Sequence, residues 1–280
     1  MTSLRLTQRL ADLAEPLDQA AEPVQEAIQS IPQPVRDLLD GVWLGSPLHP
    51  ALSDIPVGAW TAAFALDLVG SEAADGALAV GCLGAVPAAL TGLNDWSHLN
   101  DDARRIGVVH AVLNGSALTL NLASLAARRA GLRGLGKMLS GVAFAGSVVS
   151  AHLGGHLSYG LGIRVNRTAF ESPRERYAPV CDADDLDGGA FVRVELEGEA
   201  VLVTRTEETD EVCAIAATCS HLGGPLDEGE REGDSVICPW HGSRFSLCSG
   251  EVEGGPAVYP QPRYETRVRA GKVEIRAAKD

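Results

Sequence analysis

The chain has 280 residues, enough for two domains with a substantial core in each, and carries a formal net charge of −14 at pH 7. Residues 1–170 hold 14 acidic and 11 basic side chains (net −3), whereas residues 171–280 hold 23 and 12 (net −11). Because the acidic half has no basic stripe, the composition excludes a nucleic-acid-binding protein.

The first 41 residues are charged throughout and are interrupted by Pro16, Pro23, Pro32 and Pro34. Proline breaks helices because it lacks an N–H donor and clashes with the preceding turn. Between the prolines, Val24, Ile28 and Ile31 recur at helical spacing. We therefore expect residues 1–41 to be an N-terminal segment of short amphipathic helices that is partly disordered.

Four weakly polar stretches rich in glycine and alanine follow, at residues 51–70, 76–93, 106–127 and 138–157. Each is near the length that crosses a bilayer. Small residues let helices approach closely in lipid, so we expect a four-helix transmembrane bundle over residues 42–166. A soluble helical domain is the alternative, because Asp54, Asp67 and Asn114 lie within or near these stretches.

An up-and-down path of four spans would gather polar residues on one face of the bundle: His49, Asp54, Asn94, Asp95, His98, His110, His152 and His156. Ionisable groups at membrane depth are costly and therefore suggest a function. Three interpretations stay open: hydrogen bonds at helix ends, a quinone or proton-handling pocket, and axial ligation of haem b. The candidate haem or quinone residues are His49, His110, His152 and His156.

Four segments of this half carry a family resemblance: WLGSPLHPALSDIPVGAW, PAALTGLNDW, RRIGVVHAVLN and AHLGGHLSYGLGIRVN. They resemble a bacterial four-span membrane family of unknown function, over residues 42–166. The resemblance implies an integral protein of the bacterial cell membrane, in contact with membrane lipid.

The distribution of basic residues predicts which side of the membrane holds the back half. The face of the bundle from which the back half emerges carries seven arginines near the helix ends. The opposite face carries four basic residues, Arg128, Arg129, Arg133 and Lys137. The positive-inside tendency then favours a cytoplasmic back half. The pair Arg128–Arg129 could instead mark an internal twin-arginine export signal, which would place the back half outside.

After a linker at residues 167–175, the pattern changes to short alternating strands. AFVRVELEGEAVLVTRT contains two such runs around EGE, which indicates a hairpin, and further runs follow between turn residues. We expect residues 176–280 to form an all-β antiparallel domain.

Two loops of this domain pair a cysteine with a histidine. Cys219-x-His221 precedes Cys238-x-x-His241, and two thiolates with two imidazoles suit zinc or an iron–sulfur cluster. Zinc fingers commonly pair Cys with Cys and His with His. One Cys and one His from each loop fits a two-iron cluster better, with both cysteines on one iron and both histidines on the other.

Residues 176–280 resemble Rieske 2Fe-2S domains. CSHLGGPL is similar to the first cluster-binding loop, CPWHGSRFSLCSGEV to the second, and GGPA to the proline loop that shields the cluster. The resemblance implies that Cys219 and Cys238 bind one iron, that His221 and His241 bind the other, and that Ser243 donates a hydrogen bond to the cluster.

The loops also depart from the quinol-oxidising branch of that family. Gly224 and Trp240 occupy the positions of its loop disulfide, and Phe245 replaces a hydrogen-bonding tyrosine. We therefore expect a ferredoxin- or oxygenase-type site, consistent with a reducing cytoplasm. Cys213 is expected to be a buried apolar residue, and Cys248 has no partner at ligand spacing.

These features predict a multidomain membrane protein that transfers single electrons to or from redox partner proteins or the quinone pool. A complete Rieske oxygenase is not expected, because the 39 residues after His241 contain no histidine for a second iron site. The alternatives are an oxidoreductase whose membrane histidines form a second redox site and a redox sensor. Enzymatic activity beyond electron transfer stays undecided.

Overall fold

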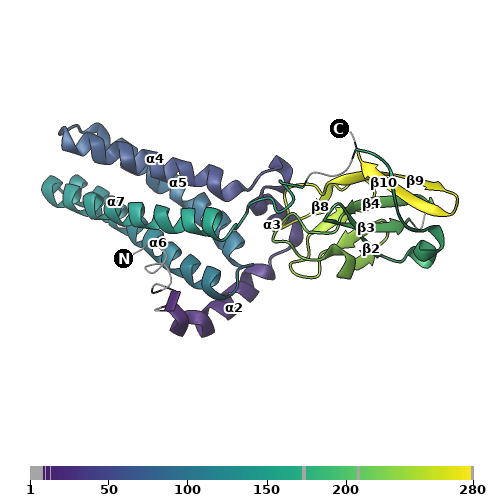
Figure 1. Ribbon diagram of the computed structural model, residues 1–280. Coiled ribbons are helices and arrows are strands. Elements are labelled where there is room, and N and C mark those ends of the chain that lie inside the picture. Colours follow the sequence, from purple (N-terminus) through teal and green to yellow (C-terminus); the bar gives the residue numbers. More distant parts are fainter. Residues whose placement is uncertain (1–8, 10, 13, 172–174, 207–208, 279–280) are drawn as a thin grey trace. The chain divides into compact units, whose positions relative to one another are not determined.

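The computed structural model describes residues 9, 11, 12, 14–171, 175–206 and 209–278. The chain forms two compact units (Figure 1). The first takes its residues from Met1–Pro32 and Pro47–Ile163, and the second from Gln33–Ser46 and Arg164–Asp280. The predicted domain boundaries at residues 41, 166 and 175 stay predictions. The beginning of the N-terminal segment and residues 172–174 of the linker lie outside the described residues.

The first unit is helical. Its elements are η1 (Glu15–Leu17), α2 (Asp18–Gln29), α4 (Leu48–Leu68), α5 (Ala73–Trp96), α6 (Asp101–Arg129), α7 (Arg133–Gly155) and the π-helical turn η3 (His156–Gly160). Glycines let the long helices pack closely: a Cβ on Gly81 would meet the Trp60 ring at 2.3 Å, and one on Gly84 would meet Ile55 at 2.4 Å. The glycine- and alanine-rich composition is therefore used for helix contact.

Three helices of the described chain are long and apolar enough to cross a membrane: α5, α6 and α7 extended to Gly160. Their outward faces carry large apolar side chains, including Val80, Leu83, Val86 and Leu90 along α5. α4 does not meet the same criterion, although it is 21 residues long. It contains His49, Asp54 and Asp67. The four predicted spans are thus supported for three helices.

α2 is held to the first unit by polar contacts. The Arg105 guanidinium pairs with Asp18 at 2.7 Å, and Gln25 Nε2 donates to the Leu99 carbonyl at 2.9 Å. Val24 of the predicted apolar stripe is exposed. Specific hydrogen bonds therefore anchor this helix.

A buried arginine joins the ends of four helices. The Arg128 side chain is only 1% exposed, and its Nη1 donates to Asp67 and to Asp75, each at 2.9 Å. Ser124 and Ser140 accept from the same guanidinium. Burying a charge is tolerable when it is paired and hydrogen-bonded in this way. Asp67 and Asp75 compensate the charge of Arg128. Arg128 is therefore not a free basic residue when the basic residues on the two sides of the membrane are compared.

Within its described residues, the second unit contains ten strands, all paired antiparallel, as the sequence predicts. A six-stranded sheet has the order β1-β10-β9-β4-β3-β2, and a four-stranded sheet the order β5-β6-β7-β8. The strands are β1 (Ala178–Asp182), β2 (Val192–Leu196), β3 (Glu199–Arg205), β4 (Val212–Ala216), β5 (Glu230–Glu232), β6 (Ser235–Ile237), β7 (Arg244–Ser246), β8 (Val252–Gly254), β9 (Arg263–Arg269) and β10 (Lys272–Ala277).

The predicted hairpin is β2–β3. Its two-residue loop places Glu197 and Gly198 at positive φ (55° and 94°) between the paired residues Leu196 and Glu199. Two residues at positive φ match the right-handed twist of the flanking strands. The local sequence therefore sets the register of this pair.

Helical elements complete the second unit: α3 (Gln33–Asp40), η2 (Val42–Leu44), η4 (Ala183–Gly189) and η5 (Leu226–Glu228). One core cluster includes Leu202, Ile215, Val236 and Phe245, and it extends to the cysteines of the two predicted cluster loops. Phe245 is fully buried, so a hydrocarbon ring fills this core position.

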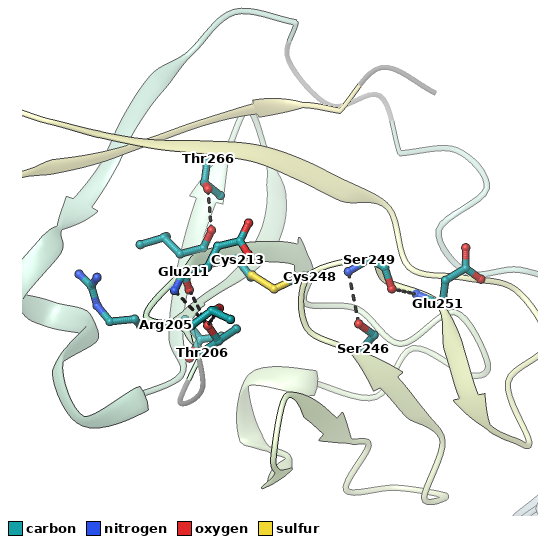
Figure 2. The surroundings of a disulfide bond; sticks show 12 residues. Arg205, Thr206, Glu211, Cys213, Ser246, Cys248, Ser249, Glu251 and Thr266 are labelled. Atoms are coloured by element: carbon teal, nitrogen blue, oxygen red, sulfur yellow. Dashed lines mark hydrogen bonds between the residues drawn. A yellow bond between two sulfur atoms is a disulfide. The ribbon is translucent and has the colours of Figure 1, made fainter.

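A disulfide joins Cys213 of β4 to Cys248 in the loop after β7, with Cα atoms 4.8 Å apart (Figure 2). Cys213 is buried as expected, but the sequence did not predict its bond to Cys248. The two cysteines lie 35 residues apart in sequence. Only the packing of the two sheets brings them within bonding distance.

Candidate metal centre

The two Cys-x-His loops fold into the same backbone turn. In the first, the Cys219 N–H donates to the Gly224 carbonyl at 2.8 Å, and the Gly223 N–H returns a bond to the Cys219 carbonyl at 2.9 Å. In the second, Cys238 N–H donates to Ser243 and Gly242 N–H donates to Cys238, at 2.8 and 3.0 Å. Gly223 and Gly242 have φ of 84° and 75°, conformations that favour glycine.

The four predicted ligands converge from these loops. The Cys219 and Cys238 thiols interact directly, and the rings of His221 and His241 lie with their centroids 5.2 Å apart, nearly perpendicular to each other. Cys219, Cys238 and His221 are buried, while His241 is partly exposed. Two thiols and two imidazoles in one place are the donor set of a Rieske-type two-iron cluster.

The surroundings shift the pKa values of the two thiols in opposite directions. The hydrogen bond with Cys219 and the N–H groups of Trp240 and His241 lower the pKa of the Cys238 thiol to about 6, against the opposing effect of burial. The same thiol pair, together with burial, raises the pKa of Cys219, which backbone N–H groups of His221 and Leu222 oppose. Such N–H donors stabilise a thiolate, the form that binds iron.

Gly224 leaves room for the thiols. A Cβ at this position would lie 2.8 Å from Cys238 Sγ and 3.1 Å from the Trp240 ring. The Trp240 side chain therefore occupies the space that a loop disulfide between positions 224 and 240 would need. Burial lowers the pKa of His241, and the exposed Trp240 ring lies edge-on to it at 6.4 Å.

A third loop, residues 254–257, is bonded to the second cluster loop. The Ala257 N–H donates to Ser243 Oγ at 3.0 Å, and Ser243 is fully buried. In this bond the Ser243 oxygen is the acceptor. Its hydroxyl hydrogen could therefore be donated to a cluster sulfur. That role stays a prediction.

Two of the four candidate membrane histidines, His49 and His110, have hydrogen-bond partners within the helical unit. His110 Nδ1 lies 2.9 Å from the Ser150 carbonyl, and its Nε2 lies 3.0 Å from the Asn114 amide nitrogen. His49 Nδ1 lies 2.8 Å from the Ala88 carbonyl. His152 is exposed, and the His156 ring packs over Gly160. Because both ring nitrogens of His110 are used, iron ligation by this residue would require the Asn114 bond to break.

Comparison with known proteins assigns both halves of the chain. The Rieske 2Fe-2S domain family matches residues 176–265, and the predicted membrane protein family DUF2231 matches residues 45–167. The ferredoxin CarAc of Metapseudomonas resinovorans is 34% identical over 100 residues, which cover 36% of this chain and 92% of the ferredoxin.

Two further relatives match the same part. Apoptosis-inducing factor 3 of Mus musculus is 34% identical over 111 residues, and the match spans 39% of this chain but only 18% of that protein. A solved complex of reduced oxygenase and oxidized ferredoxin in carbazole 1,9a-dioxygenase has a chain 32% identical, with 37% of this chain and 95% of that one covered, at a TM-score of 0.35. The chain therefore belongs to the Rieske 2Fe-2S family, as a fusion of a Rieske domain with a domain of the predicted membrane protein family DUF2231.

Proposed function

We propose that this iron–sulfur electron-transfer protein is a membrane-bound one-electron carrier of the ferredoxin type. Cys219 and Cys238 would hold one iron of the cluster, and His221 and His241 the other. The observation that carries the proposal is the convergence of these four side chains from two loops of identical backbone design. When bound, the cluster supplies reversible uptake of one electron.

The chain's own residues suit that task. Backbone N–H groups directed at the cysteine sulfurs stabilise negative charge there. His241 and Trp240 form the exposed part of the site, where a partner could come close enough for electron transfer. Residues 171–280 carry a net charge of −11, so a partner with a basic docking surface would be attracted.

Several relatives are ferredoxin components of dioxygenase systems, and one solved relative is in a complex with its oxygenase. We infer that the partners of this chain are also redox proteins, a reductase that donates the electron and an acceptor that takes it. The alternative is that the quinone pool supplies the electron. A soluble reductase would be enough to reduce the cluster in the first case and would not be enough in the second.

Four membrane crossings are part of the proposal, with α4 as the first. The segment ahead of α4 and the segment after α7 contact each other in the second unit, where Arg164 Nη2 donates to Asp40 Oδ1 at 2.8 Å. Both segments must then lie on one side of the membrane, which requires an even number of crossings. Since three helices are apolar enough by themselves, α4 supplies the fourth.

The disulfide bears on the side of the membrane. Disulfides persist in oxidising compartments and are rare in the cytoplasm. Cys213–Cys248 therefore argues against the cytoplasmic placement that the arginine count predicts. Arg105 and Arg164 of the favoured face are paired with acidic residues, as Arg128 of the opposite face is, so pairing lowers the number of free basic residues on both faces. We propose that the Rieske domain faces the extracytoplasmic side.

A haem or quinone site at the membrane histidines is not part of this proposal. The two hydrogen bonds of His110 are those of a neutral structural imidazole that holds α6 to α7. The first interpretation of the polar face, hydrogen bonding at helix ends, accounts for His49 and His110.

Electron paramagnetic resonance of the full-length protein in detergent tests the proposed cluster. Upon reduction, we expect a Rieske-type signal, and Cys238→Ser should abolish it because the thiolate ligand is lost. Cys181→Ser is the matched control, because Cys181 is a free cysteine of β1 outside both loops. A colourless protein with one zinc ion per chain would contradict the proposal.

A further inference from the structure

The proline loop is held from outside the Rieske fold by two segments that flank the helical unit in sequence. Residues 33–46 precede α4, and Arg164 follows η3, yet both belong to the second unit. In Figure 1, α3 lies beside the end of β8, where the proline loop starts. The contacts are specific and largely buried.

Arg164 makes the central contact. Its Nη1 donates to the Pro256 carbonyl at 2.7 Å, and its Nη2 donates to Asp40 Oδ1 at 2.8 Å and to the Asp40 carbonyl at 3.0 Å. The side chains of Arg164 and Asp40 are 6% and 1% exposed. A buried ion pair gains little net stability over apolar residues, so its presence here points to a positioning role.

The backbone at Arg164 supports that role. Its φ is +61°, in the left-handed region where glycine is favoured and other residues are strained. An arginine at such a position carries a conformational cost that glycine would avoid. The side chain's bonds to Pro256 and Asp40 offset that cost.

α3 holds the neighbouring residue of the loop. The Gly255 N–H donates to Asp37 Oδ1 at 2.8 Å, and Gln33 Nε2 donates to the Gly255 carbonyl at 3.2 Å. A Cβ on Gly255 would lie 2.9 Å from Asp40 and 3.2 Å from Val42. The loop backbone is thus pressed directly against this segment.

Hydrogen bonds connect the proline loop, and Tyr259 just after it, to both cluster loops. Ala257 bonds to Ser243 of the second, and Ser220 Oγ of the first donates to the Tyr259 carbonyl at 2.7 Å. The Arg167 N–H donates to the Ser220 carbonyl at 3.0 Å. A displacement of the proline loop would therefore reach the surroundings of all four ligands.

We propose that Arg164 is a positioning residue of the cluster site, and that with Asp40 and Asp37 it clamps the proline loop over the cluster. The clamp keeps water from the cluster on this side and leaves the side of His241 and Trp240 for electron exchange. This inference rests on the proposed cluster, and it makes residues 33–46 part of the redox domain although they precede the membrane helices in sequence.

Arg164→Ala in the full-length protein tests the clamp. Losing the guanidinium removes the bonds to Pro256 and Asp40 and lets the loop open, so we expect a changed Rieske signal, a shifted midpoint potential and cluster bleaching by a chelator about tenfold faster or more. Arg164→Lys, which keeps the charge but cannot reach all three oxygens at once, should fall between Arg164→Ala and wild type.

Arg267→Ala is the matched control, since Arg267 pairs with Glu274 within the β9–β10 hairpin. Asp37→Ala is a second test at a half-exposed position, should Arg164→Ala fail to fold, and it should also speed bleaching. If Arg164→Ala and Asp37→Ala match Arg267→Ala in spectrum, potential and bleaching rate, the clamp is refuted. A wild-type protein without a Rieske signal would instead contradict the proposed function.

Discussion

At the scale of single residues, the conformation of the cluster loops depends on glycines, which leave space for neighbouring side chains. Gly224 accommodates the Cys238 sulfur and the Trp240 ring, and both loops turn through a glycine at positive φ. The ligand types and their spacing were predictable from sequence, because they are a local pattern. The contact between Gly224 and Trp240 was not, because it joins two loops that are separate in sequence.

Glu171 is the residue whose protonation should affect stability most visibly. Burial, followed by the charge of Glu199, raises its pKa to about 7 from 4.5. The folded protein therefore holds this proton more tightly than the unfolded chain. Stability is highest below the unfolded pKa and falls as pH rises from about 4.5 to about 7.

Glu171→Gln should remove the loss of stability that accompanies the ionisation of Glu171. We expect the variant to be more stable than wild type by about 1–3 kcal/mol at pH 8, a range reduced for partial exposure, and by much less at pH 4.5. Thermal unfolding in detergent at the two pH values measures the difference. Glu195→Gln, at an exposed position of β2, is the control and should be neutral at both. Equal effects of the two substitutions at pH 8 would exclude a raised pKa of Glu171 in the folded protein.

At the scale of elements, the two sheets are cross-linked next to the cluster loops. β4 leads into the first cluster loop, and the loop that contains Cys248 follows β7, which begins after the second (Figure 2). Hairpin β2–β3 could be predicted because its alternation and its Glu-Gly turn are contiguous. The pairing of Cys213 with Cys248 could not, because it depends on how one sheet packs on the other.

Removing the disulfide should destabilise the Rieske domain without removing a ligand. For a loop of this length, Cys213→Ser should cost about 2–4 kcal/mol and lower the unfolding temperature, because the unfolded chain regains the freedom that the cross-link restricts. Cys82→Ser, in α5, is the control. Alkylation of the denatured wild type without reductant should spare Cys213 and Cys248. Labelling of both would show that no bond forms.

At the scale of the whole molecule, the segment before α4 and the segment after η3 belong to the same compact unit. Residues 33–46 and 164–280 contact each other, which supports the proposal that the helices between them cross the membrane an even number of times. Three helices are apolar enough to cross by themselves, so under this proposal α4 is the fourth span despite His49, Asp54 and Asp67.

The proposed orientation rests on the disulfide and can be measured directly. In right-side-out vesicles of the bacterial membrane, added protease should degrade the Rieske domain, while inverted vesicles should protect it until detergent is added. A cytoplasmic protein that is degraded only in inverted vesicles is the control. The reverse pattern would place the domain in the cytoplasm, as the arginine count alone predicts.

The sequence by itself determined the two domain types and the antiparallel β domain, and it predicts four cluster ligands, because each is encoded in contiguous patterns of hydropathy or spacing. Tertiary structure decided the rest. It paired Cys213 with Cys248, compensated Arg128 with Asp67 and Asp75, and brought Asp37 and Asp40 to the proline loop. Such contacts join residues between 35 and more than 200 positions apart, and no local pattern encodes which of many polar groups will meet once the chain is packed.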